Sequence, residues 1–395
     1  MPKGELLEKI HQHLESIDFF IKSHDNELVT INGGLPGIVI FYFHLHKVTQ
    51  NERHYESAVA NLELLFDQLE KNMPERYVYS SGLAGLGWFF KYIQRFIDVD
   101  NELDTPEMDA VFMNAAQKEL SVRNYEYLTG FSGILKYLLS KESTDSALLS
   151  KFIDEVHDQV FALENPISFF ESEDERHKFP SVNLGVSHGV YGFVAILNTF
   201  CAKQINPEKC KAILQLIINF TFEHKKDFVT NGKFFPNRIG KNVKENRRSR
   251  LAWCYGDLGI LTVLYSSGEV LKDANLKAEV VQMLLNTTLR KDMDMSMMND
   301  IWLCHGTVGA AHIFQRLYKT TEIADFKFAA DFWFRKTLEQ LDKGSPQIKA
   351  SHTRSGSYAR KDLTGFLIGY AGLGLSLLSK LPEADLDWDS MILMS

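Results

Sequence analysis

Two cysteines and one histidine in this sequence are of the residue types that hold zinc. Cys254 lies in the segment WCYG, and Cys304 and His305 lie in the segment CHG. Zinc prefers sulfur and nitrogen donors in a tetrahedral arrangement, and a site with three protein ligands keeps a fourth position open for water or substrate. An open position is typical of a catalytic site, and a thiol bound there is deprotonated. These residues therefore predict a zinc enzyme that activates a thiol.

Each of the three residues alone is also typical of a packed core, where a cysteine behaves as a small apolar side chain. The sequence contains no Cys-x-x-Cys pair, so the spacing is not that of a zinc finger. Metal binding is favoured over a role in the hydrophobic core only if another feature of the sequence brings the three residues together.

The glycines provide such a feature, because a Gly-x-x-Gly pair occurs seven times and an apolar run follows each pair. The pairs begin at Gly34, Gly82, Gly130, Gly189, Gly256, Gly306 and Gly369, at intervals of 48, 48, 59, 67, 50 and 63 residues. Recurrence at a roughly regular interval of this size is the signature of a repeat fold.

The candidate residues share two positions when they are counted from the first glycine of each pair. Cys254 and Cys304 lie two residues before it, and His188, Tyr255 and His305 lie one residue before it. In the first three repeats, the second of these positions holds Gly33, Ser81 and Thr129. Because equal places in a ring of repeats have equal height, the candidate side chains are predicted to converge in one sector of one mouth.

The elements that position these side chains are predicted to be helices. The runs after the glycine pairs are apolar on all sides, as in Leu35–Leu45, and a helix of this kind must be buried. Between these runs lie polar stretches with one apolar stripe, as at Leu62, Leu65 and Leu69. Seven buried helices surrounded by seven amphipathic ones predict an all-α fold, an α/α toroid that forms one domain over residues 1–395.

The composition excludes several classes of protein. A formal net charge of -8 argues against nucleic acid as the main partner, although Lys241–Arg250 is locally basic. The longest apolar run, Leu35–Leu45, is too short to span a bilayer, and the N-terminus predicts an amphipathic helix rather than a signal peptide. We therefore expect a cytoplasmic protein without disulfides. Cys201 and Cys210, which lie outside the glycine register, are predicted to be structural.

Three connections between the predicted helices are unusually long: Glu164–Leu184, Phe228–Ser249 and Asp342–Asp362. Long loops in compact domains are often binding segments or lids. These connections are therefore candidates for peptide contact, and ordinary surface loops are the alternative. We expect the first of them to be irregular.

Three motifs resemble the signature motifs of the LanC-type lanthionine cyclase family in order, register and spacing. They are SHGVYG at Ser187, WCYGDLG at Trp253 and CHGTVG at Cys304. The resemblance covers essentially the whole chain, and it implies the family's α,α-toroid with one zinc ion. It also implies the family's reaction, in which a peptide cysteine adds to dehydroalanine or dehydrobutyrine. The product is a thioether ring, lanthionine or methyllanthionine, in a modified ribosomal peptide.

The resemblance implies the same three zinc ligands and adds four residues to the site. His188 matches the family's proposed acid/base histidine, and Tyr255 matches the tyrosine that follows the first ligand. Arg250, four residues before Cys254, matches an arginine near the active site. Glu126 departs from the pattern, because the family often has aspartate there; the carboxylate is kept but reaches one methylene further.

The resemblance leaves the thiol donor open. A peptide cyclase would receive a dehydrated precursor peptide from a separate dehydratase, because no dehydratase region precedes the predicted toroid. Peripheral association with a modification or export complex is compatible with this role. A relative that adds glutathione to dehydroamino acids would use the same zinc site. A non-catalytic zinc-bearing scaffold is a third reading, although a scaffold needs no acid.

A glycosidase would require paired carboxylates, and the register supplies thiols instead. A zinc-dependent prenyltransferase would also activate a thiol, but its motifs differ from these.

Overall fold

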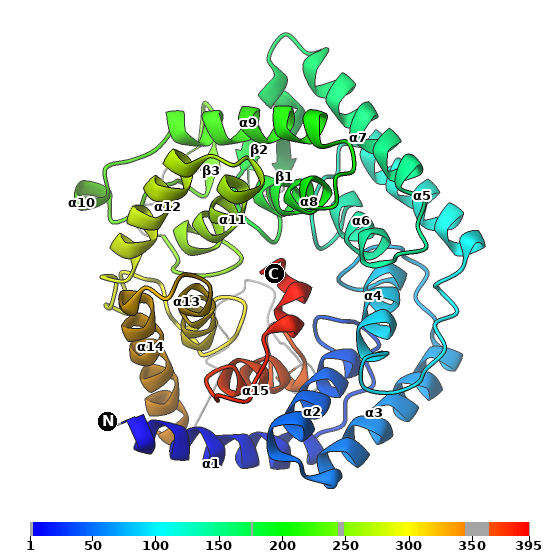
Figure 1. Ribbon diagram of the computed structural model, residues 1–395, viewed down its shortest axis with the longest axis vertical. Coiled ribbons are helices and arrows are strands. Elements are labelled where there is room, and N and C mark those ends of the chain that lie inside the picture. The colour runs from blue at the N-terminus through cyan, green and yellow to red at the C-terminus, as the bar shows by residue number, and fades with distance from the viewer. Residues whose placement is uncertain (1–2, 175–176, 244–248, 344–362, 395) are drawn as a thin grey trace. The chain divides into compact units, whose positions relative to one another are not determined.

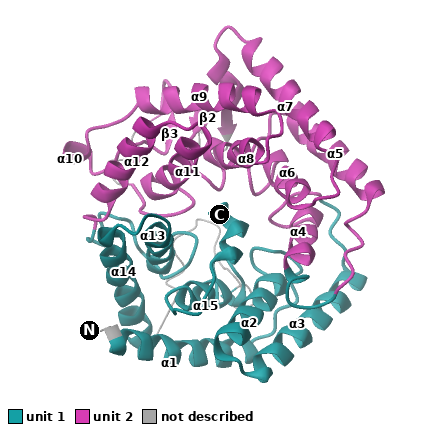
Figure 2. Cartoon of the chain, viewed as in Figure 1, with its two compact units in different colours: residues 1–76, 93–98, 291–395 teal, residues 77–92, 99–290 magenta. Residues whose placement is uncertain are grey.

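The computed structural model describes residues 3–174, 177–243, 249–343 and 363–394, which are mainly helical (Figure 1). The chain divides into two compact units, shown in Figure 2. Unit 1 contains residues 1–76, 93–98 and 291–395, and unit 2 contains residues 77–92 and 99–290. No helix in the described residues is long and apolar enough to cross a membrane. The single domain over residues 1–395 stays a prediction.

Unit 1 consists of two layers of helices. The helices that directly follow a glycine pair, here called glycine-led helices, are α2 (Leu35–Thr49), α13 (Thr307–Thr321) and α15 (Tyr370–Leu378). The helices that cover them are α1 (Lys3–Lys22), α3 (Glu52–Lys71) and α14 (Ala324–Asp342). Helix α15 contacts α2 and α13, while α3 packs on α2, α14 on α13 and α1 on α15. The short 3-10 helix η3 (Asp387–Ile392) lies near the C-terminus.

Unit 2 has the same two layers. Its glycine-led helices are α4 (Leu83–Ile93), α6 (Phe131–Ser140), α8 (Val190–Ala202) and α11 (Asp257–Val270). Its covering helices are α5 (Pro106–Ser121), α7 (Ser146–Phe161), α9 (Pro207–Glu223) and α12 (Ala274–Thr287). Helix α8 contacts α6 and α11, while α5 packs on α6, α9 on α8 and α12 on α11. The helix predicted after each of the seven glycine pairs is therefore confirmed.

Burial follows the predicted division into two kinds of helix. All residues of α2 from Leu35 to Leu45 are buried, whereas α1 buries one stripe that includes Leu6, Ile10 and Leu14. Burying a leucine or isoleucine side chain contributes about 1.5–3 kcal/mol. The stripe, rather than the helix propensity of the segment, therefore holds α1 on the core.

In five of the glycine pairs, the second glycine is required by the turn that precedes its own helix; these glycines are Gly133, Gly192, Gly259, Gly309 and Gly372. A Cβ atom on Gly133 would lie 2.2 Å from the Tyr127 carbonyl oxygen, and one on Gly309 would lie 2.0 Å from the Leu303 carbonyl oxygen. In both cases the carbonyl lies six residues earlier in the chain. The chain therefore folds back over the first turn of the helix, and any side chain there would collide with backbone.

Backbone hydrogen bonds join the turns of successive repeats. In unit 1 the Cys304 N–H donates to the Leu367 carbonyl at 3.0 Å, and the Leu367 N–H donates to the Asn32 carbonyl at 2.9 Å. In unit 2 the Ser80 N–H donates to the Leu128 carbonyl at 2.9 Å. All five residues lie two positions before the first glycine of their repeat. Equal register therefore means neighbouring backbone, as predicted, within each unit.

The all-α prediction is wrong for the connection Glu164–Leu184, which was expected to be irregular. It contains a 3-10 helix, η1 (Pro166–Phe170), and two antiparallel strands, β1 (Glu171–Asp174) and β2 (His177–Asn183). β2 also pairs with β3 (Arg238–Ile239), which gives a sheet of order β1-β2-β3. The connection Phe228–Ser249 therefore supplies an edge strand as well as the short helix α10 (Phe228–Asn231).

The third long connection, Asp342–Asp362, lies outside the described residues from position 344 onward. Part of the basic stretch Lys241–Arg250, residues 244–248, lies outside them as well. The roles predicted for these two segments stay predictions.

Candidate functional site

The predicted site residues lie in the turns that lead into glycine-led helices. In unit 2 the turn before α8 carries His188, and the turn before α11 carries Cys254 and Tyr255. The Val186 N–H donates to the Cys254 carbonyl at 3.0 Å. A Cβ on Gly185 would lie 2.8 Å from both that carbonyl oxygen and the Tyr255 ring. The turn that carries His188, here called the histidine turn, is therefore a direct neighbour of the turn that carries Cys254.

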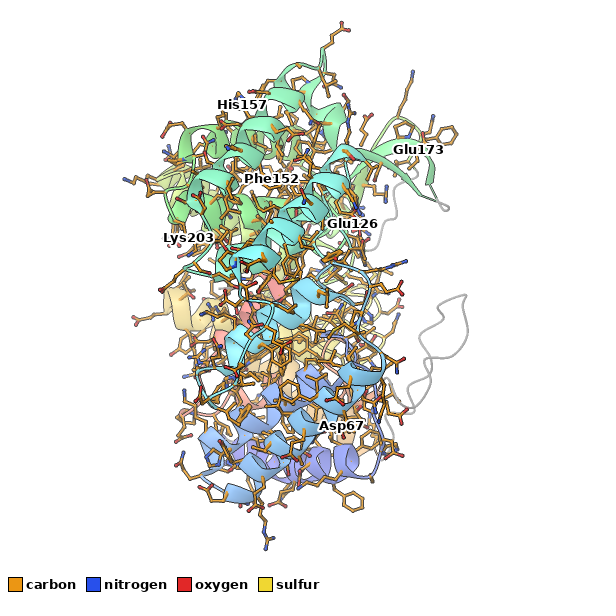
Figure 3. The ribbon with its side chains drawn as sticks, turned by 90° about the vertical axis from the view of Figure 1, so that its right-hand side faces the viewer. Asp67, Glu126, Phe152, His157, Glu173 and Lys203 are labelled. Atoms are coloured by element: carbon orange, nitrogen blue, oxygen red, sulfur yellow. The ribbon has the colours of Figure 1, made fainter. Side chains whose placement is uncertain are left out.

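Glu126, which is labelled in Figure 3, lies in the turn before α6 and contacts His188. Its Oε2 atom lies 3.1 Å from His188 Nδ1 and accepts a hydrogen bond from the Thr129 hydroxyl at 2.5 Å. The His188 and Glu126 side chains are 42% and 31% exposed, so both are accessible to a solute. A carboxylate on one ring nitrogen stabilises the protonated imidazole, in which the other ring nitrogen can transfer a proton.

Asn183 organises the same region and was not identified from the sequence. Its side-chain amide donates to the His188 carbonyl at 2.9 Å and to the Tyr255 hydroxyl at 3.2 Å. The His188 and Tyr255 rings lie 6.5 Å apart between centroids, with 29° between their planes. Burial raises the pKa of the Tyr255 phenol, so the hydroxyl stays a neutral donor at neutral pH.

The backbone carbonyl of Arg250 packs against the start of α11, directly after the turn that carries Cys254 and Tyr255. A Cβ on Gly256, whose φ is +98°, would lie 2.0 Å from the Arg250 carbonyl oxygen, so this carbonyl packs on the start of α11. The Arg250 side chain is half-buried and makes no hydrogen bond or ion pair with another described residue. Its predicted role stays a prediction.

In unit 1 the turn before α13 carries Cys304 and His305. His305 Nδ1 lies 2.8 Å from Asp300 Oδ2, and both side chains are largely buried. The other Asp300 oxygen accepts the Trp302 N–H at 3.0 Å, which fixes the carboxylate. Metal-binding histidines typically donate one ring nitrogen to such a carboxylate, which directs the other nitrogen to the metal. His305 therefore has the support expected of a ligand through Nε2.

A sequence signal for Asp300 and Asn183 exists in the glycine register. Each residue lies six positions before the first glycine of its repeat, and each accepts with its side chain the N–H two residues later. Aspartate and asparagine favour this local turn. A search for these two residue types at this position would have identified both.

The sequence and the fold of this chain both match those of known proteins. Residues 27–393 match the sequence pattern of the family described as "Lanthionine synthetase C-like protein". The chain belongs to the lanthionine synthetase C-like family. The nisin biosynthesis protein NisC of Lactococcus lactis subsp. lactis is 26% identical over 402 residues, which cover 94% of this chain and 88% of that protein. The solved structure of a nisin cyclase matches the fold with a TM-score of 0.76 at 18% identity, over 99% of this chain and 98% of that one.

The three predicted zinc ligands do not all lie in the same compact unit. Cys254 lies in unit 2, while Cys304 and His305 lie in unit 1. Within residues 3–174, 177–243, 249–343 and 363–394, no group of three or more His, Cys, Asp or Glu side chains has an arrangement that could hold a metal ion. The zinc site stays a prediction, and its support is the donor types together with the Asp300–His305 contact.

The two other cysteines of this family member lie in the consecutive helices α8 and α9, Cys201 near the end of α8 and Cys210 in the first turn of α9. Both Cys201 and Cys210 are buried. The Cys201 thiol donates to the Pro207 carbonyl at 3.9 Å, and the Cys210 thiol donates to the Ile205 carbonyl at 3.8 Å. These contacts where α8 joins α9 agree with the structural role predicted for both cysteines.

Proposed function

We propose that this protein is a zinc-dependent lanthionine cyclase. It would add cysteine thiols of a dehydrated ribosomal peptide to dehydroalanine or dehydrobutyrine and form thioether rings. The observation that carries the proposal is the adjacency of the Cys254 turn to the turn of His188, whose imidazole contacts Glu126. Thiol addition requires a group that binds the thiol and an acid. Cys254 would be a ligand of the zinc that binds the thiol, and His188, supported by the Glu126 carboxylate, would be the acid.

The proposal includes a zinc ion on Cys254, Cys304 and His305. It requires the seven repeats to close into a double ring of inner and outer helices, which would bring the ligand of unit 2 to the two ligands of unit 1. Two thiols and one imidazole fit zinc, and Asp300 would hold the imidazole in the tautomer that binds through Nε2. When bound, zinc would supply a substrate thiolate at neutral pH.

The peptide thiolate forms a carbon–sulfur bond with the β-carbon of the dehydro residue. The electron pair of the carbon–carbon double bond moves toward the adjacent amide, where negative charge develops on the carbonyl oxygen. Arg250 or a backbone dipole stabilises this charge. A proton then adds to the α-carbon, so the thiol proton is returned overall and the mass of the peptide is unchanged.

His188 is the proposed donor of that proton. In its protonated form it would have Nδ1–H directed at Glu126 and Nε2–H directed at the substrate. Glu126 lowers the cost of the positive charge, and Asn183 fixes the backbone of the histidine turn through its carbonyl. The Tyr255 hydroxyl, which stays protonated, lies beside this acid as a second hydrogen-bonding group.

The proposed partners follow from this chemistry. The peptide must arrive with its serine or threonine residues already dehydrated, so a separate dehydratase acts before this protein. The reaction is proposed to take place in the cytoplasm, where the peptide thiols remain reduced.

The proposal is tested with a dehydrated candidate peptide, mass spectrometry and thiol alkylation. Native protein is expected to leave the peptide mass unchanged and to remove its alkylatable thiols. Cys304→Ala is expected to abolish both zinc binding and ring formation, and His188→Ala is expected to keep zinc but to slow ring formation by about 10²–10⁴-fold. Full ring formation together with retained zinc in Cys304→Ala would contradict the metal assignment.

The same assay separates the proposal from the alternative thiol donor. Glutathione added to the reaction would raise the mass of the peptide if the protein transfers it, whereas ring formation would not. Ring formation in the absence of glutathione supports the peptide cyclase.

A further inference from the structure

Asp257 and Arg290 form a buried charge pair in unit 2, outside the predicted site. Arg290 Nη1 lies 3.7 Å from Asp257 Oδ2, and the two side chains are 8% and 0% exposed. Burial raises the pKa of the Asp257 carboxyl, and the Arg290 charge opposes this rise. A buried ion pair contributes little net stability compared with apolar packing. The backbone groups that the pair binds are therefore the better guide to its role.

One side of the pair holds the segment that follows α10. The two carboxylate oxygens of Asp257 accept the N–H groups of Phe234 and Phe235, each at 3.0 Å. Strand β3 begins three residues later at Arg238, which pairs with Asn183 of β2. Asn183 is the residue whose amide binds both the histidine turn and the tyrosine of the site. Asp257 thus fixes the start of the strand that supports this amide.

The other side of the pair holds the backbone beside Arg250. Arg290 Nη2 donates to the carbonyl of Ser249, which is buried. The next carbonyl, that of Arg250, packs against the start of α11, as the 2.0 Å distance to a Cβ on Gly256 shows. The backbone on both sides of the Arg250 Cα is therefore held.

We propose that Asp257 and Arg290 are positioning residues that clamp residues 234–235 and 249 and so direct the Arg250 side chain to the reacting peptide. This inference rests on the proposed function, in which Arg250 stabilises the developing negative charge. Both side chains are buried, so we expect neither to touch the peptide. A displacement of about 1 Å in such a group costs on the order of hundredfold in rate.

The test is a mutant cycle measured on cyclisation of a dehydrated peptide. Arg290→Lys keeps the positive charge, but an ammonium group cannot join the Ser249 carbonyl and the Asp257 carboxylate as a planar guanidinium does. We expect kcat to fall by about tenfold to hundredfold, with KM changed by less than about twofold. In the Arg250→Ala background, the same replacement is expected to cost less than about threefold, because its effect acts through Arg250. Equal losses in the two backgrounds would overturn the proposal.

Arg316→Lys is the matched control. Arg316 also pairs with a buried aspartate, Asp389 at 3.2 Å, but it lies in unit 1 and outside the predicted site. We expect this variant to keep the native kcat. A loss as large as that of Arg290→Lys would mean that breaking any buried pair slows the reaction, and it would count against positioning.

Hydrogen exchange tests the clamp without the reaction. Asp257→Asn keeps the side-chain shape but turns an NH2 group toward a backbone donor. Faster exchange at Phe234 and Phe235 than in the native protein is expected, and unchanged exchange would overturn the clamp. If Arg290→Lys does not fold, Asp257→Asn takes its place in the cycle. If the native protein forms no ring, the proposed function fails, and the exchange measurement still decides whether the clamp exists.

Discussion

At the scale of single residues, a carboxylate and a histidine meet although they are distant in sequence. The Glu126 side chain, which is one methylene longer than that of aspartate, reaches His188 Nδ1 at 3.1 Å. The Thr129 hydroxyl binds the same carboxylate oxygen and limits its movement. The extra methylene is therefore accommodated without loss of the contact.

Glu126→Gln is expected to slow cyclisation by about tenfold to hundredfold, because a neutral amide stabilises protonated His188 less than a carboxylate does. The measurement is the initial rate of thiol loss from a dehydrated peptide. Glu173→Gln, which changes an exposed carboxylate on β1 that is also labelled in Figure 3, is expected to leave the rate unchanged. A native rate in Glu126→Gln would remove Glu126 from the proposed mechanism.

Asp300 has the corresponding position beside His305. Asp300→Asn is expected to weaken zinc binding by about 10–100-fold, because supporting carboxylates have effects of this size on metal affinity. Competition with a chelator measures the change. Asp292→Asn is the control, because Asp292 only caps a turn by accepting the Met295 N–H, which an amide oxygen also accepts. Equal zinc affinity in Asp300→Asn and the native protein would contradict the proposed ligand role of His305.

At the scale of elements, the turn before each glycine-led helix sets where side chains stand. Gly309→Ala is expected to lower the free energy of unfolding by about 1–3 kcal/mol, because its Cβ would lie 2.0 Å from the Leu303 carbonyl oxygen. Gly4→Ala in α1 has nothing within 4 Å of its Cβ and is expected to be neutral or slightly stabilising. Chemical denaturation of both variants checks this prediction, and equal stabilities would show that the turn relaxes freely.

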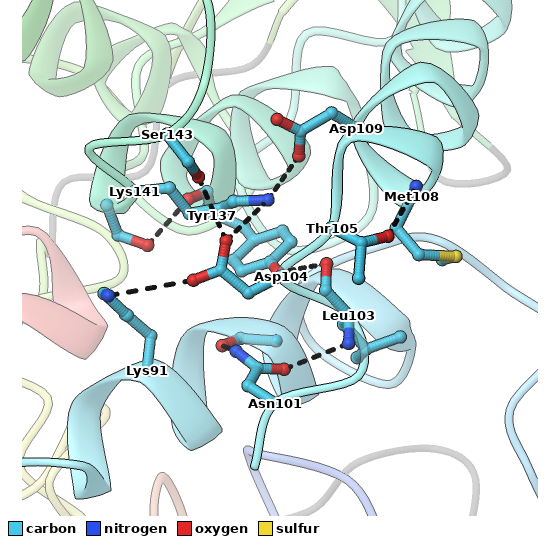
Figure 4. A network of polar contacts seen from close by, with 12 residues as sticks. Lys91, Asn101, Leu103, Asp104, Thr105, Met108, Asp109, Tyr137, Lys141 and Ser143 are labelled. Carbon is cyan, nitrogen blue, oxygen red and sulfur yellow. Dashed lines mark hydrogen bonds and ion pairs between the residues drawn. The ribbon is translucent and has the colours of Figure 1, made fainter.

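A second element-scale feature is a polar network that ties the connection between α4 and α5 to the end of α6 (Figure 4). The Lys141 side chain is fully buried between the carboxylates of Asp104, at 2.9 Å, and Asp109. Burial alone would raise the pKa of Asp104, but the hydrogen bond and charge of Lys141 outweigh it and lower this pKa. The folded-state pKa is therefore below the unfolded value.

This sign determines the pH dependence of stability. The contribution of Asp104 is present above its unfolded pKa of about 3.9 and is lost as pH falls through the lower folded value. Lys141→Met is expected to lower the free energy of unfolding at pH 7 by about 3–5 kcal/mol and to remove this part of the acid sensitivity. Denaturation at pH 7 and at low pH measures both effects. Lys211→Met, which breaks an exposed pair with Glu208, is expected to cost less than about 1 kcal/mol.

At the scale of the whole molecule, unit 1 is assembled from three separate stretches of chain, so its stability depends on both chain ends. Helix α1 packs on α14 and α15. The C-terminal segment bears three alternating aspartates, of which the first two pair with basic residues from the other two stretches and the third pairs within its own stretch. The pairs are Asp385–Lys47 at 2.5 Å, Asp387–Arg95 at 2.7 Å and Asp389–His312 at 3.0 Å.

Asp389→Ala is expected to destabilise unit 1 by about 3–5 kcal/mol, because it leaves the Arg316 charge without its buried partner. Asp387→Ala removes a 55%-exposed carboxylate from the same segment and is expected to cost less than about 1 kcal/mol. Thermal unfolding and limited proteolysis of the C-terminal segment measure the difference. Equal behaviour of the two variants would show that the buried contacts do not anchor this segment.

Most of the helical framework could be predicted from local sequence patterns. The glycine pairs mark the start of each buried helix, and the run Leu35–Leu45 is buried throughout, as its composition indicated. The register also identified Cys304 and His305 as neighbours of the α13 start. These features are local, because periodicity and the absence of a Cβ act within one or two helical turns.

The partners of the site residues could not be predicted in this way. Glu126 lies 62 positions from His188, and Arg290 lies 33 positions from Asp257. Strands β2 and β3, which pair with each other, come from two different long connections. No pattern along the chain specifies such contacts, because they arise when separate helices pack and bring their leading turns together. Residue types and register thus predicted the candidate chemistry, while packing between repeats decided which charges face one another.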